Sequence, residues 1–332
     1  MKEKLLEYLS CPTCSRDFVL QNVTESVAHE IIAGELFCRG CEKLVRIIRG
    51  VPRFASLDVI GTDKVATAEN FGWQWQHFTQ TDTYYDDQFL GWIAPVTPDF
   101  FRGKVVLEGG CGKGRHTQLA ARWDAKEVVG VDLSSAVETA FAATRDLDNV
   151  HIIQADIYNL PLKRVFDYAF SVGVLHHMPE PFAGFRSLAG KVKKGGHLSA
   201  WVYGAENNRW ITSFVDPLRE RFTSRMKKPV LLQLSKIPTA FLFLATKLIY
   251  GPLNRSDAGS GLAKQLFYND YLNAISKFGW REHHTIVFDH LVAPTSHYIP
   301  RKDFAEWWKA LDAEDVRIEW HNKNSWRGFG RL

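Results

Sequence analysis

The sequence lacks a strong excess of charge and a long uncharged apolar run, and we expect no secretory leader. Its 332 residues carry 41 Lys and Arg against 37 Asp and Glu, a formal net charge of +4, which is too small a bias to demand a nucleic-acid partner. Residues 230–250 are strongly apolar, but Lys236 and Lys247 interrupt them and no uncharged run reaches about 18 residues, so we predict no membrane-spanning helix. Residues 1–10 are charged and amphipathic, which predicts a cytoplasmic, reducing location.

The most informative stretch that is present is residues 105–116, VVLEGGCGKGRH. It predicts a strand that ends at Glu108, a glycine-rich loop and a helix that begins near Arg115. Such a unit binds nucleotide-like ligands in α/β proteins, because glycines let the backbone approach the ligand and helix N–H groups face its anionic part. The spacing is E-x-G-x-G-x-G with the acid first, which differs from the G-x-G-x-x-G of dinucleotide-binding folds.

Two later strands also end in an acid, Asp132 in EVVGVD and Asp156 in HIIQAD. An acid at the tip of the second strand of a Rossmann-like sheet accepts hydrogen bonds from ribose hydroxyls, and the alternative is that Asp132 caps the helix near Ser134. The β–α alternation between residues 104 and 203 predicts a parallel sheet covered on both faces. The four strands that follow the glycine-rich loop are predicted within residues 127–132, 151–156, 165–178 and 193–204.

These motifs, in this order, resemble those of class I S-adenosylmethionine-dependent methyltransferases. The segments GCGKGRH, GVDLS, ADIYNLPL, SVGVLHHMPEP and KKGGHL carry the resemblance over roughly residues 100–204. It implies a Rossmann-like α/β fold with S-adenosylmethionine as cofactor and S-adenosylhomocysteine as product. It also implies that Asp156 and Ile157 contact adenine, while Cys111 is a packed small side chain rather than a nucleophile. The residues expected to bind the cofactor are Trp73, Gln74, Trp75, Glu108, Gly109, Gly110, Cys111, Gly112, Arg115, Asp132, Leu133, Asp156, Ile157, Ser171 and Gly173.

Four of the five cysteines form two C-x2-C pairs near the start of the chain, Cys11 with Cys14 and Cys38 with Cys41. Two such pairs supply four thiolates for a tetrahedral zinc ion, and the closed ligand set predicts a structural metal. Two disulfides or a rubredoxin-like iron site are the alternatives. The segment resembles the small zinc-ribbon activator protein that partners eukaryotic tRNA and protein methyltransferases, here fused in cis as in bacterial methyltransferases that carry it. Bracing the catalytic domain is the favoured role.

An aromatic segment, residues 69–92, links the ribbon to the first strand of the core. Its FGWQWQHF stretch resembles the one in bacterial methyltransferases with the same ribbon, which implies that Trp73, Gln74 or Trp75 lies near the methionine end of the cofactor. The alternative is that these residues pack the linker onto the sheet. We expect Gly72 to break any long helix there.

Residues 205–300 are predicted to be a helical insertion that selects the substrate. The part at 218–229 is basic and the part at 230–250 is apolar. A lid packed on the protein is the favoured interpretation, followed by a surface for a lipid-linked substrate or membrane interface, and then by a dimer contact. His283 and His284 are expected on a strand, one facing in and one out, and residues 288–304 on a loop that reaches the active site.

Residues 301–332 are predicted to form the last helix and the C-terminal hairpin of the core. The expected organisation is therefore a zinc ribbon, an aromatic arm that covers the cofactor, a Rossmann-like core, a helical lid, and the end of the core. Its boundaries are 1–56, 57–100, 101–204, 205–300 and 301–332, respectively. The sequence does not indicate an oligomeric state.

Methyl transfer is an in-line displacement at a sulfonium, so the protein mainly positions the acceptor, with a base where the acceptor carries a proton. The candidate catalytic residues are His176 and His177 after the fourth strand, then His297 and Tyr298, with His290, on the late loop. No NPPY tetrad follows the fourth strand, which argues against N6-adenine methylation. We therefore expect O- or N-methylation of a small molecule, a sugar or a lipid-linked intermediate. RNA methylation with the ribbon touching RNA is the alternative, and a non-enzymatic scaffold is a third.

Overall fold

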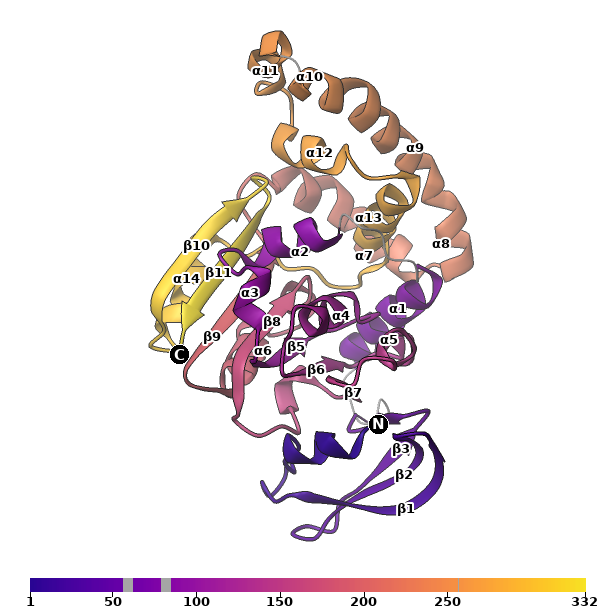
Figure 1. Cartoon of the computed structure of the whole chain (residues 1–332). Coiled ribbons are helices and arrows are strands. Elements are labelled where there is room, and N and C mark those ends of the chain that lie inside the picture. Colours follow the sequence, from indigo (N-terminus) through magenta and orange to yellow (C-terminus); the bar gives the residue numbers. More distant parts are fainter. Residues whose placement is uncertain (56–61, 79–84, 256) are drawn as a thin grey trace.

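The computed structural model describes residues 1–55, 62–78, 85–255 and 257–332, and it places a central sheet between two appendages (Figure 1). A small antiparallel sheet lies at one end and a group of helices at the other. The expected boundary at residues 56–57 lies outside the described residues. The small sheet has the order β1-β2-β3-β4, with strands β1 (Phe18–Val27), β2 (Glu30–Cys38), β3 (Leu44–Ile48) and β4 (Val51–Pro52), after the 3-10 turn η1 (Glu3–Glu7).

The central sheet has seven strands in the order β10-β11-β9-β8-β5-β6-β7. All neighbouring pairs from β9 to β7 are parallel, and β11 is antiparallel to both β9 and β10. The expected Rossmann-like sheet with an antiparallel hairpin is thus confirmed. Its strands are β5 (Val105–Gly109), β6 (Glu127–Asp132), β7 (Val150–Gln154), β8 (Phe166–Val172), β9 (Val192–Tyr203), β10 (Glu314–His321) and β11 (Ser325–Arg331).

Helices cover both faces because neighbouring residues of each strand point to opposite sides. On β5, Val106 packs in a core with Phe89 and Leu119, whereas Leu107 packs in a second core with Phe185. The first core lies beneath α2 (Tyr85–Ile93), α3 (Pro98–Phe101), α4 (Arg115–Arg122) and α5 (Ala136–Thr144). The second lies beneath α6 (Pro181–Ala189) and α14 (Arg301–Lys309) and continues into the small sheet. The short turns η3 (Ile157–Asn159) and η4 (Leu175–His177) follow β7 and β8.

The segment between β9 and α14 forms the helical appendage, which is drawn in orange at the top of Figure 1. It begins with η5 (Ile211–Val215), α7 (Asp216–Arg221) and η6 (Thr223–Arg225). Next come α8 (Lys228–Leu234), α9 (Lys236–Ala245), η7 (Thr246–Tyr250) and α10 (Gly251–Arg255). It ends with α11 (Asp257–Ala263), α12 (Asn269–Ile275) and α13 (Trp280–Val292).

Three expectations about local structure are wrong. His283 and His284 lie on helix α13, and both are buried because the helical segment from α8 to η7 supplies a hydroxyl partner for each of them. Residues 288–292 end that helix, so the late loop begins only at Ala293. Gly72 does not end a helix: α1 (Thr62–His77) continues through it, and its missing side chain lets α1 approach Ser135, whose Oγ would lie 2.8 Å from a Cβ there.

The apolar stretch of the insertion also differs from expectation. The helical residues Lys228–Arg255 are long and apolar enough, by length and composition alone, to cross a membrane. Lys236 and Lys247 therefore do not by themselves disqualify the segment. Only 22% of its most apolar window is buried inside the protein, so the expected lid packed on the protein is packed along one face only.

Candidate active site

The glycine-rich loop after β5 turns tightly beneath the start of α4. Gly110, Gly112 and Gly114 have φ angles of +82°, +51° and +81°, which residues other than glycine rarely adopt. The backbone N–H of Gly110 donates to the carbonyl of Val131 at 2.7 Å. The loop is thus fixed to the end of β6, and its backbone faces an open cavity.

This cavity, which we call the loop cavity, has a volume of about 160 Å³. It lies at the carboxyl ends of the parallel strands, where open α/β sheets bind their ligands. Its lining includes the ten expected cofactor residues Trp75, Gly110, Cys111, Gly112, Arg115, Asp132, Leu133, Asp156, Ile157 and Gly173. It also includes Lys64, Phe71, Tyr158, His177, Met178 and Asp289, of which only His177 was expected at the site.

Two acids project from the strand ends into the loop cavity. Asp132 accepts hydrogen bonds from the backbone N–H groups of Gly112 and Ser134, both at 2.8 Å, and burial raises its pKa. The bond from Ser134 N–H closes a turn ahead of α5, whose N-cap is Ser135, so Asp132 does not cap that helix as the alternative interpretation expected. Asp156 accepts from the N–H of Tyr158 at 3.0 Å and from Lys64 Nζ at 2.8 Å. Helix α1 thus supplies a lysine to the lining of the cavity.

Five expected cofactor residues lie behind the cavity wall rather than in it. Burial raises the pKa of Glu108 to about 8, and its carboxyl contacts His116 and Thr117 of α4. Ser171 Oγ donates to the carbonyl of Gly109 at 2.8 Å. These contacts hold the loop from behind. The remaining two residues, Trp73 and Gln74, lie on α1.

Helix α1 crosses the cavity and presents successive aromatic residues in different directions. Trp75 lines the cavity and lies 3.1 Å from where a Cβ at Gly112 would stand. Trp73 points away and stacks on His77 with ring centroids 3.6 Å apart. Gln74 is buried between them, and its Nε2 donates to Asp289 Oδ1 at 3.2 Å.

A second cavity of about 280 Å³, the insertion cavity, opens between the sheet and the helical appendage. Five residues line both cavities: Trp75, Arg115, Val172, Gly173 and Asp289. A ligand in the loop cavity and a ligand in the insertion cavity would therefore meet across these side chains. The insertion cavity is lined further by Trp92, Trp201, Tyr203, Tyr271, Phe278, Lys277, Glu282, Thr285, His290 and His321.

Asp289 occupies the junction between the cavities. It lies on α13 and accepts hydrogen bonds from Gln74 and from the Tyr203 hydroxyl, the latter at 3.3 Å. Burial raises the pKa of its carboxyl. Our sequence interpretation did not single out Asp289. Its only signal was its position among proton-handling residues in the segment FDHLVAPTSHYIP, which we expected to form a loop.

Among the expected catalytic histidines, His177 lines the loop cavity. Its Nδ1 lies 2.8 Å from the carbonyl oxygen of Thr295, and because a carbonyl only accepts, Nδ1 carries the proton and Nε2 is free to accept one. Burial lowers the pKa of His177 to about 4, so the imidazole is neutral at pH 7.

Of the four other candidates, His290 on α13 lines the insertion cavity, whereas His176, His297 and Tyr298 line neither cavity. His176 is fully buried and stacks on Tyr203 with centroids 3.9 Å apart, and its carbonyl accepts from the N–H of His297 at 2.7 Å. Tyr298 stacks on the other side of this group, 5.8 Å from Tyr203. Tyr203, at the end of β9, contacts His176 and Tyr298 and itself lines the insertion cavity.

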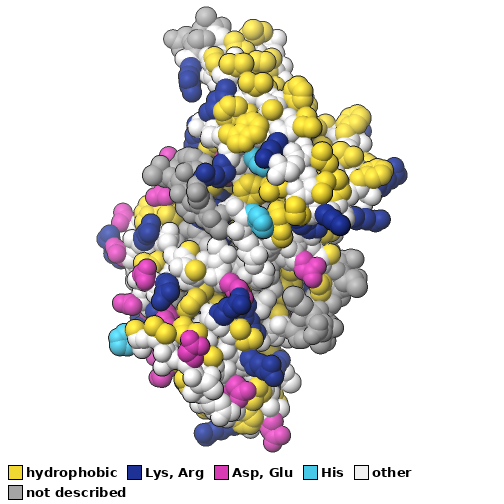
Figure 2. Space-filling view, turned by 90° about the vertical axis from the view of Figure 1, so that its right-hand side faces the viewer, with side chains coloured by type: hydrophobic (Ala, Val, Ile, Leu, Met, Phe, Trp, Pro, Cys, Tyr) yellow, Lys and Arg dark blue, Asp and Glu magenta, His cyan; other side chains and the backbone are white. Residues whose placement is uncertain are grey.

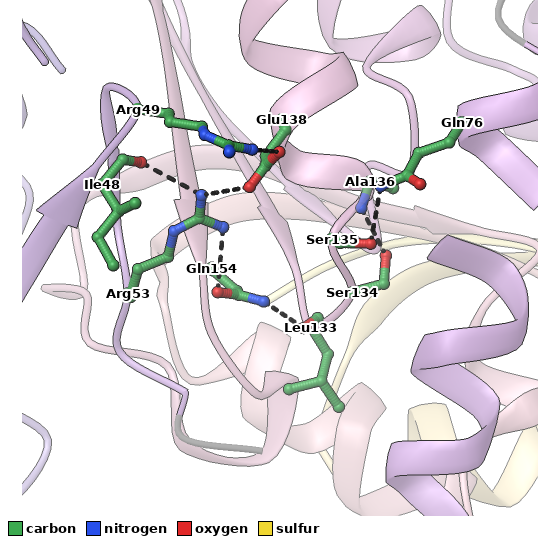
Figure 3. Close-up of polar contacts among 10 residues, drawn as sticks. All are labelled: Ile48, Arg49, Arg53, Gln76, Leu133, Ser134, Ser135, Ala136, Glu138 and Gln154. Carbon is green, nitrogen blue, oxygen red and sulfur yellow. Dashed lines mark hydrogen bonds and ion pairs between the residues drawn. The ribbon is translucent and has the colours of Figure 1, made fainter. Parts of the chain in front are cut away.

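The ribbon reaches the loop cavity through a short series of polar contacts (Figure 3). Arg53 donates to Ile48, to Glu138 on α5 at 3.0 Å and to Gln154 Oε1 on β7 at 3.2 Å. Gln154 in turn donates to the carbonyl of Leu133 at 2.9 Å. Leu133 lines the cavity beside Asp132, so the ribbon supports the loop that carries this acid.

The four ribbon cysteines converge as a metal site would require. Their sulfur atoms all lie within 4.8 Å of one another, with Cys11 and Cys41 3.5 Å apart and Cys14 and Cys38 3.4 Å apart. A tetrahedral Zn²⁺ with Zn–S bonds of about 2.3 Å places its sulfurs about 3.8 Å apart. All four are free thiols. The cluster fits a structural zinc ion, with no side-chain position left for a substrate.

Comparison with known proteins places the site in a recognisable domain. Residues 107–200 match the family model described as "Methyltransferase domain", which confirms the resemblance to methyltransferases for that part of the chain. The chain is 35% identical over 110 residues to a tRNA U34 carboxymethyltransferase of Pseudoalteromonas atlantica, covering 31% of this chain and 34% of the relative. It is 29% identical over 202 residues to one of Shewanella sp. (strain ANA-3), covering 59% and 54%.

The chain thus spans between about a third and about half of the length of these curated relatives. Among solved structures, a SAM-dependent methyltransferase from Aquifex aeolicus is similar with a TM-score of 0.40 and 12% identity, covering 76% of this chain and 100% of that one.

Proposed function

We propose that the protein is an S-adenosylmethionine-dependent methyltransferase that binds its donor in the loop cavity and its acceptor in the insertion cavity. The observation that carries the proposal is the shared wall of the two cavities. Trp75, Arg115 and Asp289 belong to both linings, together with Val172 and Gly173. A donor and an acceptor bound on the two sides would be adjacent without any large rearrangement.

The loop cavity offers the groups that this donor needs. Asp132 would accept the ribose hydroxyls, Asp156 and Ile157 would contact adenine, and the glycine loop would face the methionine part. Bound there, the donor supplies an electrophilic methyl group on a sulfonium. The aromatic face of Trp75, on the shared wall, suits such a cation.

Asp289 is the best-placed base for an acceptor that must lose a proton. It lies on the shared wall, and hydrogen bonds from Gln74 and Tyr203 fix its orientation. Burial raises the pKa of its carboxyl toward neutral pH, which makes the carboxylate a stronger base. His177, neutral and with a free Nε2, is the second candidate, on the loop-cavity side. Gln74 and Tyr203 act as positioning residues for Asp289.

The insertion cavity favours a small or medium-sized acceptor with both an apolar and a polar part. Its wall combines indole and phenyl rings with the polar groups of Tyr203, Glu282 and His290. O- or N-methylation of a metabolite, a sugar or a lipid-linked intermediate fits such a wall. A zinc–thiolate ribbon needs reduced cysteines, which favours the cytoplasm as the site of action.

An RNA acceptor is the second candidate, and the observation in its favour is the name of the curated relatives, which are tRNA U34 carboxymethyltransferases. A nucleobase would have to leave its stack to enter a cavity enclosed in this way. The net charge of +4 provides little attraction for a phosphate backbone.

The test has two steps. Titration calorimetry with S-adenosylhomocysteine should show binding that Asp132→Ala abolishes and that a matched surface variant, Asp148→Ala, leaves intact. Methyl-labelled donor is then incubated with a cell lysate that is fractionated into nucleic acid, protein, lipid and aqueous metabolites. Label in the aqueous or lipid fraction supports the first candidate, label in RNA supports the second, and absence of cofactor binding overturns both.

A further inference from the structure

The long helical segment of the insertion has its polar side facing the protein and its apolar side facing outward. Along α8, α9 and η7 the residues with at most 1% exposure are Leu231, Ser235, Thr239 and Thr246, three of them hydroxyl residues. Ser235 Oγ is hydrogen-bonded to His284 at 2.8 Å, and Thr246 Oγ1 to His283 at 2.9 Å. A surface helix of a globular protein normally shows the reverse arrangement.

The outward side of the same segment is a continuous apolar stripe. Its residues are spaced alternately by three and four, which places them on one helix face, and they are between 48% and 72% exposed. The stripe consists of Leu234, Ile237, Phe241, Leu244 and Leu248. Exposed Phe214, Leu218 and Phe222 precede it in η5, α7 and the turn after α7. Figure 2 shows hydrophobic side chains gathered over this part of the molecule.

The charged side chains that the segment itself carries are all of one sign. Between residues 221 and 255 the chain has no Asp or Glu, and its Lys and Arg residues are Arg221, Arg225, Lys227, Lys228, Lys236, Lys247 and Arg255. Most of them are exposed, and dark-blue side chains border the hydrophobic area in Figure 2. An apolar stripe with a basic border is the pattern of helices that lie in the headgroup region of anionic membranes.

We propose that this stripe is a docking surface for an anionic phospholipid bilayer, in which α8, α9 and η7 lie in the plane of the interface. The apolar side chains enter the acyl boundary, and the bordering Lys and Arg contact lipid phosphates. The name docking stripe is used below for Leu234, Ile237, Phe241, Leu244 and Leu248.

The contacts of the opposite face show why this segment lies on a membrane rather than across it. The bonds from Ser235 and Thr246 to α13 are 11 residues apart along the chain, about 16 Å of helix. Lys247 Nζ also donates to the carbonyl of Ser276 at 2.6 Å. One whole side of the segment is thus bound to the protein, and only the other side is free to meet lipid.

A second copy of the chain fits this surface less well than a membrane does. In a twofold interface the same patch meets itself, so the basic border of one copy would face that of the other. No acidic residue between 221 and 255 is present to neutralise it. Anionic lipid headgroups provide the charge that the patch lacks.

Docking in this way would bring the insertion cavity close to the bilayer. Helix α13 binds the docking segment through His283 and His284, and it lines the insertion cavity with Glu282, Asp289 and His290. The cavity is therefore about one helix diameter, roughly 10 Å, from the docked segment. If the proposed function holds, the acceptor belongs to the lipid-linked class and reaches the cavity from the membrane.

The experiment is co-sedimentation of the full-length protein with phosphatidylcholine vesicles, with and without phosphatidylglycerol. The double variant Phe241→Glu, Leu248→Glu removes two exposed stripe residues. Val23→Glu, Val27→Glu on β1 is the control, because these two residues are apolar and exposed as well, at 46% and 50%, but lie on the ribbon. Unfolding temperature and S-adenosylhomocysteine binding are measured on every variant, so that loss of the fold is recognised.

The expected result is binding that requires phosphatidylglycerol, weakens with salt and falls at least about tenfold in the stripe variant but not in the control. Three results overturn the proposal: equal binding of both variants, no vesicle binding together with a dimer that the stripe variant dissociates, or resistance to alkaline extraction, which indicates a spanning helix. Vesicle binding without cofactor binding would instead reject the proposed function and leave the docking stripe standing.

Discussion

The two appendages of the central sheet bury opposite kinds of side chain. In the ribbon, the apolar residues Met1, Leu5 and Leu9 point inward and join the same core as Leu107 of β5 and Phe185 of α6. The helical insertion turns hydroxyl and imidazole groups inward and leaves Phe241 and Leu248 exposed. The ribbon therefore completes the core of this molecule, while the insertion retains a surface that something outside the chain can cover.

The polar contacts show the same difference. The ribbon is attached to the sheet by Lys4 with Glu127, by Arg53 with Glu138 and by main-chain bonds such as Ser10 N–H to the carbonyl of Pro161 at 2.9 Å. Glu127 is the first residue of β6 and Glu138 lies on α5, so these contacts hold the ribbon against the sheet and the helix beside it. The insertion instead supplies one wall of a cavity. One appendage should thus control stability, and the other should control what is bound.

The largest effect is expected from breaking the ribbon. Cys38→Ser removes one of four converging thiols, and a sheet of this size has too little core to fold without its metal. We expect the free energy of unfolding to fall by about 4 kcal/mol or more, measured by denaturant titration together with zinc content. Cys111→Ala, outside the cluster, should keep the full zinc content. A metal-free Cys38→Ser protein as stable as the wild type would show that the ribbon does not brace the core.

A second effect tests the junction between core and insertion. Burial lowers the pKa of His290 to about 4 from its ordinary value of 6.5. Folding therefore favours the neutral imidazole of His290. The contribution of this group to the free energy of unfolding is complete above pH 6.5 and is lost as the pH falls through 4. The contribution of His290 alone to the free energy of unfolding is about 3 kcal/mol.

The measurement is the free energy of unfolding of the wild type and of His290→Gln between pH 7 and pH 4. Other groups titrate in both proteins, including Glu108, whose raised pKa acts in the opposite direction. The difference between the two curves isolates His290, and we expect the variant to lose less stability on acidification. Parallel curves would mean that His290 is solvated in the folded protein.

The inverted polarity of the docking segment can be tested with two substitutions on one helix. Thr246→Val keeps the shape but leaves His283 Nε2 without its hydroxyl partner, which should cost about 1–2 kcal/mol. Phe241→Ser, on the exposed side, should change stability by less than about 0.5 kcal/mol. An ordinary amphipathic helix would give the reverse order, so chemical denaturation of the two variants decides between them.

The sequence predicted the sheet and most of the loop cavity because those features depend on local pattern. The glycine spacing and the acids that end β6 and β7 are short motifs whose geometry follows from the strand-turn-helix unit. Similarly, the two C-x2-C pairs each fix two ligands within one turn. Ten of the expected cofactor residues line the cavity for this reason.

The parts that the sequence did not predict depend on tertiary contacts. Asp289 became a site residue only because α13 brings it to Gln74 and Tyr203, residues far apart in the chain. The run REHHTIVF has β-branched residues and alternation that favour a strand, but the hydroxyl partners on η7 and at the end of α8 stabilise it as a helix with both histidines buried. Gly72 is tolerated in α1 because it packs against Ser135.

The smallest effect tests whether the ribbon acts on the cofactor site beyond stabilising the fold. Arg53 and Arg49 both pair with Glu138, but only Arg53 also contacts Gln154, which holds the carbonyl of Leu133. We expect Arg53→Ala to weaken S-adenosylhomocysteine binding about threefold, close to the loss of one partly exposed hydrogen bond, while Arg49→Ala leaves it unchanged. Calorimetric titration of both variants, each compared with its own unfolding temperature, separates the two roles. Equal affinities would confine the ribbon to stability and place all control of binding in the insertion.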